Sequence, residues 1–67
     1  MAGPTESTAA ELAAIGDNVA QYRTRVADLA DRFIGTERDD VVTAIHEVER
    51  RLRNAERTIV RALRVLD

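Results

Sequence analysis

Residues 12–33 read LAAIGDNVAQYRTRVADLADRF, and the large apolar side chains in this stretch recur every three or four positions. The two step lengths alternate without a break, giving a repeat of about 3.5 residues, which keeps one stripe of a helix apolar. Such a stripe predicts a helix that packs along another helix with a left-handed supercoil. We call these residues the first seam: Leu12, Ile15, Val19, Tyr22, Val26, Leu29 and Phe33.

The same alternation returns after residue 40 and continues almost to the last residue. The β-branched run at residues 41–45 is typical of a strand, but the helical period continues through it, so we expect a second helix. The second seam consists of Val41, Ile45, Val48, Leu52, Ala55, Ile59, Ala62 and Leu66.

The segment between the seams contains the signals of a turn. Gly35 suits the left-handed position that ends a helix, and Thr36 with Asp39 suits the start of the next one. We therefore expect one domain, with a flexible tail at 1–7, helices at about 8–33 and 37–66, and a turn at 34–36. Thr8 and Glu11 have the spacing of a capping box at the first helix start.

These elements predict an all-α fold, an antiparallel coiled-coil hairpin whose two seams face each other. Facing positions should have numbers that add to roughly 71, which places Val26 near Ile45, Val19 near Leu52, and Leu12 near Ile59.

A second apolar surface predicts that two hairpins assemble into a four-helix bundle, most simply a homodimer. The second helix ends in a wide apolar surface that includes Val60, Leu63 and Val65. On the first helix a stripe of small residues should admit another chain; we call it the small-residue stripe: Ala9, Ala13, Gly16, Ala20, Ala27 and Ala30. We expect self-association to depend on Leu12, Ile15, Val19, Tyr22, Val26, Leu29, Phe33, Val41, Ile45, Val48, Leu52, Ile59, Leu63 and Leu66.

Composition argues against an enzyme. The chain has 67 residues, which is too few to frame a deep cleft between lobes, and it has no cysteine for a disulfide or a zinc site. The sole histidine, His46, has Thr43 where a di-metal bundle would need glutamate. We expect a surface histidine, with no catalytic residue, no metal and no cofactor.

Charge is distributed unevenly along the chain. Residues 1–49 carry a net charge of −6, whereas residues 50–67 carry +4. Five arginines of the second helix share the face opposite its seam; we call them the arginine row: Arg50, Arg53, Arg57, Arg61 and Arg64.

Three interpretations of the arginine row remain open. The first is a solvated face with local ion pairs, such as Glu49–Arg53, Glu56 with neighbouring arginines and, across the hairpin, Arg23–Glu49. The second is a face that binds a protein partner, and the third is a face that binds nucleic acid. Nucleic acid is the weaker of the two binding hypotheses, because no aromatic side chains are interleaved with the arginines. We therefore expect a non-catalytic interaction or regulatory protein.

Targeting signals are not apparent. The first residues lack a basic region followed by an apolar run, and no window approaches a membrane span, so we expect a cytoplasmic protein with no membrane contact. All ten basic residues are arginine, a bias that suggests a GC-rich, actinobacterial genome.

Two resemblances supply alternatives. Phe33-Ile34-Gly35 at the bend resembles the Trp-x-Gly family of ESAT-type proteins, whose dimeric helical hairpins are type VII secretion substrates. The chain differs in having phenylalanine for tryptophan, in being shorter, and in lacking a Tyr-x-x-x-Asp/Glu signal at its end. The layout is also similar to Rop-like RNA-binding hairpins, an analogy of architecture alone, which implies a nucleic-acid-binding dimer.

The register yields a first prediction. Leu52→Asp places a charge in the centre of the second seam, so it should unfold the chain or leave it monomeric. Circular dichroism and light scattering measure helicity and mass. Full helicity with the wild-type mass would show that the predicted register is wrong.

Overall fold

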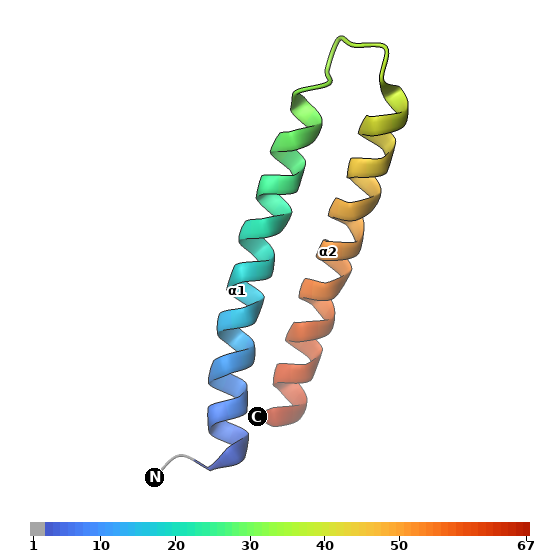
Figure 1. Cartoon of the computed structure of the whole chain (residues 1–67). Helices are drawn as coiled ribbons and strands as arrows, with labels where there is room; N and C mark the ends of the chain where they lie inside the picture. Colours follow the sequence, from blue (N-terminus) through green and yellow to red (C-terminus); the bar gives the residue numbers. More distant parts are fainter. Residues whose placement is uncertain (1–2) are drawn as a thin grey trace.

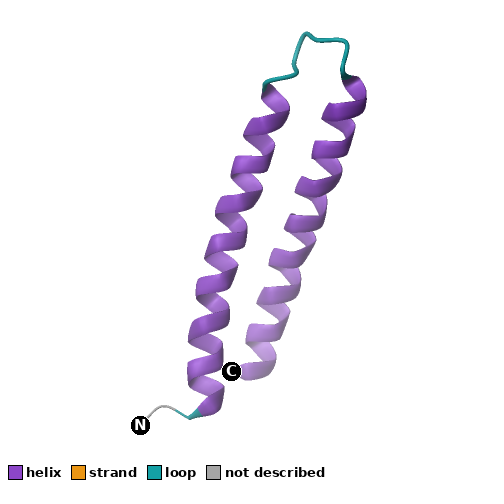
Figure 2. Cartoon of the chain, viewed as in Figure 1, coloured by secondary structure: helices purple, strands orange, loops and turns teal. Residues whose placement is uncertain are grey.

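The chain folds as two long helices joined by a turn, in a computed structural model that describes residues 3–67 (Figure 1). α1 spans Pro4–Asp31, α2 spans Asp39–Leu66, and the two helices pack side by side in opposite directions. Within the described residues, helix is the only regular secondary structure (Figure 2). The predicted all-helical hairpin is therefore confirmed.

α1 begins earlier than the sequence predicts. Its first residue is Pro4, whose fixed φ suits the first helical position, and Gly3 precedes it in an extended conformation. Thr8 consequently lies within the helix, where it does not form the predicted capping box. The expected tail at 1–7 is therefore helical from residue 4, while residues 1–2 lie outside the described range.

The turn depends on one glycine and one hydroxyl group. Gly35 has a φ of 81°, the left-handed conformation that the sequence predicts for it. The Thr36 hydroxyl donates to the carbonyl of Phe33 at 2.7 Å and accepts a hydrogen bond from the backbone N–H of Arg38 at 3.2 Å. Since these contacts hold residues 36–38 in the turn, α2 begins at Asp39, two residues later than predicted.

The start of α2 is stabilised by charge. Asp39 and Asp40 lie in its first turn, where carboxylates complement the helix dipole. The Arg38 guanidinium donates to both carboxylate oxygens of Asp40, at 3.0 and 3.1 Å, and these hydrogen bonds lower the pKa of Asp40.

The two helices approach each other through small residues of α1. Ala30 is 3% exposed and is the only buried residue in the described range. A Cβ atom placed on Gly16 would lie 3.2 Å from Cγ2 of Ile59, closer than ordinary van der Waals contact. Ala20 and Ala27 are half-buried, whereas Ala13 is exposed. Part of the small-residue stripe therefore faces α2 within one hairpin, while Ala13, Gly16 and Ala20 line a shallow groove with Ile59 and Val60. That this stripe receives a second chain stays a prediction.

Where the helices approach closely, only some residues of the first seam are covered. Leu12, Val19, Val26 and Phe33 are half-buried, whereas three intervening residues remain exposed. We call these three residues, which lie seven apart on one face of α1, the outer apolar row: Ile15, Tyr22 and Leu29. In the second seam Val48 is also exposed. The other residues of this seam are half-buried: Val41, Ile45, Leu52, Ala55, Ile59, Ala62 and Leu66.

Gly16 supplies a test of the close approach. Gly16→Leu should lower the free energy of unfolding by about 2 kcal/mol, because the new side chain must displace Ile59. The matched control is Ala13→Leu, one turn away on the exposed part of the stripe, which should change it by less than about 0.5 kcal/mol. Chemical denaturation measures both, and equal effects would contradict the packing described here.

Candidate functional site

The arginine row lies on the outer face of α2. All five of its side chains are exposed, and from Arg50 to Arg64 the row covers about 21 Å along the helix axis. Guanidinium groups in such a row can form paired hydrogen bonds with carboxylates or phosphates. The chemistry available to the row is therefore the binding of anionic groups.

The first part of the row is neutralised by glutamates of α2 itself. Arg50 pairs with Glu47, which also contacts Arg51 at 3.1 Å, and Arg53 lies 3.8 Å from a carboxylate oxygen of Glu49. The Glu49–Arg53 pair is the one predicted from the sequence. The Glu47 pairs were not predicted, although spacings of three and four residues could have revealed them.

The arginines in the second part of the row are not neutralised by carboxylates. Arg57 donates to the side-chain carbonyl of Asn54 at 3.2 Å, and Arg61 donates to the hydroxyl of Thr58 at 3.1 Å. Both acceptors are neutral, and across residues 3–67 neither these two arginines nor Arg64 forms an ion pair. The uncompensated charge is thus concentrated at Arg57, Arg61 and Arg64.

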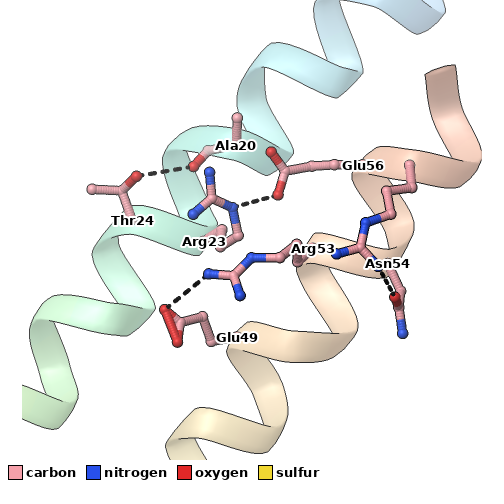
Figure 3. A network of polar contacts seen from close by, with 8 residues as sticks. Ala20, Arg23, Thr24, Glu49, Arg53, Asn54 and Glu56 are labelled. Carbon is pink, nitrogen blue, oxygen red and sulfur yellow. Dashed lines mark hydrogen bonds and ion pairs between the residues drawn. The ribbon is translucent and has the colours of Figure 1, made fainter.

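A single ion pair joins the two helices in the described part of the chain. Nε of Arg23 on α1 lies 2.5 Å from a carboxylate oxygen of Glu56 on α2, and both side chains are partly buried (Figure 3). The predicted partner of Arg23, Glu49, instead faces Arg53 (Figure 3).

The direction of helical side chains explains this correction. Each side chain leans toward the N-terminus of its own helix. In an antiparallel pair, Arg23 therefore leans toward Glu56 and away from Glu49. The same tilt brings Ile59 into contact with Gly16, one turn beyond Leu12, which is its predicted neighbour.

His46 lies on the surface beside Glu49. Its Nδ1 is 3.5 Å from a carboxylate oxygen of Glu49, and the imidazole is mostly exposed. Two such groups do not make a metal site, and within the described residues the structure contains no cluster of three or more possible metal-binding side chains.

Comparisons with known proteins find no matching family model, no similar curated protein and no similar solved structure. Neither α1 nor α2, which together hold most of the described residues, has an apolar stretch long enough to cross a bilayer. The function is therefore inferred from the geometry and charge of the surface.

The ion pair between the helices yields a prediction. Glu56→Gln should lower the free energy of unfolding by about 1 kcal/mol, because Arg23 would keep a partly buried charge without its counterion. Glu47→Gln, which removes only exposed contacts, should change it by less than about 0.5 kcal/mol. Thermal denaturation at neutral pH compares the two variants. Equal effects would show that the cross-helix pair adds nothing to stability.

Proposed function

We propose that this chain is a non-catalytic interaction protein that forms a homodimeric four-helix bundle and binds an acidic protein surface through its arginine row. The observation that carries the partner assignment is the group of uncompensated guanidinium groups at Arg57, Arg61 and Arg64. A protein carboxylate that reaches these groups need not displace an existing carboxylate, which favours binding there over binding at Arg50.

Two features support assembly into a bundle. Among residues 3–67, only Ala30 is buried, so one hairpin has almost no interior of its own. Large apolar side chains remain exposed on both helices, including Tyr22 at 54% and Val65 at 85%. A second hairpin would remove these side chains from water.

The charge pattern favours a protein over nucleic acid. Within the arginine row, the members that form no ion pair among the described residues, Arg57, Arg61 and Arg64, span about two turns at the end of α2, roughly 10 Å along the axis. The proposal places the protein and its partner in the cytoplasm, as the sequence leads us to expect.

Charge neutralisation of unpaired and of paired arginines on α2 tests this function. Partners would be identified by crosslinking in the native cell followed by mass spectrometry, and their affinities measured with purified proteins. Arg57→Gln/Arg61→Gln should weaken binding at least tenfold, because it removes two guanidinium groups that no carboxylate neutralises. Arg50→Gln/Arg51→Gln removes the same charge but from arginines paired with Glu47, and should weaken binding less than threefold.

Two results would contradict the proposal. Equal affinities of the two double variants would show that uncompensated charge does not select the partner. Tighter binding of duplex RNA or DNA than of the crosslinked protein, with affinity falling steeply as salt rises, would replace the protein partner by nucleic acid.

A further inference from the structure

The outer apolar row is spaced symmetrically about its middle residue. Ile15 lies seven residues before Tyr22 and Leu29 lies seven residues after it. When a second α1 runs antiparallel with Tyr22 opposite Tyr22, Ile15 of each copy therefore lies opposite Leu29 of the other. A shift of one heptad would place Leu29 opposite Thr8, so only the Tyr22-centred register matches every large apolar residue of the row.

We propose that two copies of this chain join through the outer apolar row, with α1 antiparallel to α1 and the two-fold axis at Tyr22. This inference rests on the dimer of the proposed function and specifies its interface. The occupant of the shallow groove lined by Tyr22, Val26 and Leu29 is α1 of the second copy.

Charged residues beside the row complement each other in the same register. Glu11 and Arg32 are exposed at opposite ends of this side of α1, and within residues 3–67 neither takes part in an ion pair. Antiparallel pairing about Tyr22 brings Glu11 of one copy beside Arg32 of the other, twice in the dimer. Arg25, whose guanidinium carbon lies 5.8 Å from the Tyr22 ring centroid, comes beside the neutral Asn18. The register therefore creates two attractive pairs and no like-charge contact along this edge.

The ends of the hairpin agree with an antiparallel arrangement. Ile34 in the turn is 73% exposed, and Val65 at the opposite end is exposed further still. Two hairpins that run in opposite directions place each turn beside the last residues of the other copy, so both apolar ends gain a neighbour.

The hairpin exposes more surface than a compact monomer of its mass. The accessible surface is 5289 Å², whereas a compact monomer of this mass would have about 4200 Å². The excess of roughly 1100 Å² is more than the ~800 Å² that each partner contributes to a standard stable interface. One copy of this chain therefore has enough surplus surface to form a stable dimer.

Engineered cysteines test the register, since the chain has no native cysteine. Under mild oxidation Tyr22→Cys should form a disulfide-linked dimer at least tenfold faster than Thr24→Cys, an exposed control facing away from the row. Ile15→Cys and Leu29→Cys chains should link mainly to each other when mixed, and only slowly to themselves. Self-linking of Ile15→Cys at the faster rate would show a parallel arrangement and overturn the inference.

Charge reversal provides a second test, in the wild-type background without engineered cysteines. Glu11→Arg and Arg32→Glu should each raise the dimer Kd about tenfold, and the double variant should restore it to within threefold. Failure of the double variant to recover would overturn the register. Light scattering of the wild type separates the two proposals: a dimer without the expected crosslinks refutes this interface only, whereas a particle of 7.4 kDa refutes the proposed dimer as well.

Discussion

The close approach of α1 to α2 through small residues is the constraint on which the rest of the structure depends. Gly16 leaves just enough space for Ile59, and Ala30 is almost completely buried. Because these small residues lie where α1 meets α2, four of the seven residues of the first seam are half-buried, at Leu12, Val19, Val26 and Phe33. The other three, including Tyr22, are left in solvent. The interior of the hairpin and its unfilled outer surface therefore have the same cause.

The same close approach arranges the charges. It places Arg23 in the row that faces α2, where a carboxylate must accompany it, and Glu56 provides that carboxylate. Glu47 and Glu49 neutralise the first arginines of α2. Among residues 3–67, no carboxylate lies within ion-pair distance of Arg57, Arg61 or Arg64. The proposed partner surface thus consists of the arginines of the row that form no ion pair within the described part of the chain.

The sequence predicts the hairpin because the heptad repeat and the glycine in the turn are local signals. It does not predict how the helices rotate about their axes, since a repeat of about 3.5 residues is compatible with contact at either edge of the seam. The sequence therefore pairs Arg23 with Glu49, whereas in the structure Arg23 pairs with Glu56. The positions of the arginine row follow from helical spacing alone. Which of these arginines pair with a carboxylate depends on side-chain rotamers, which only the structure describes.

The central claim is that one hairpin is an incomplete folding unit. The thermal unfolding midpoint of the wild type, measured by circular dichroism across a thousandfold range of protein concentration, tests this claim most directly. Unfolding coupled to dissociation should raise the Tm steadily with concentration, because mass action stabilises the associated native state. A Tm that stays constant over the whole range, with full helicity at the lowest concentration, would show that the hairpin is stable alone and would contradict this account.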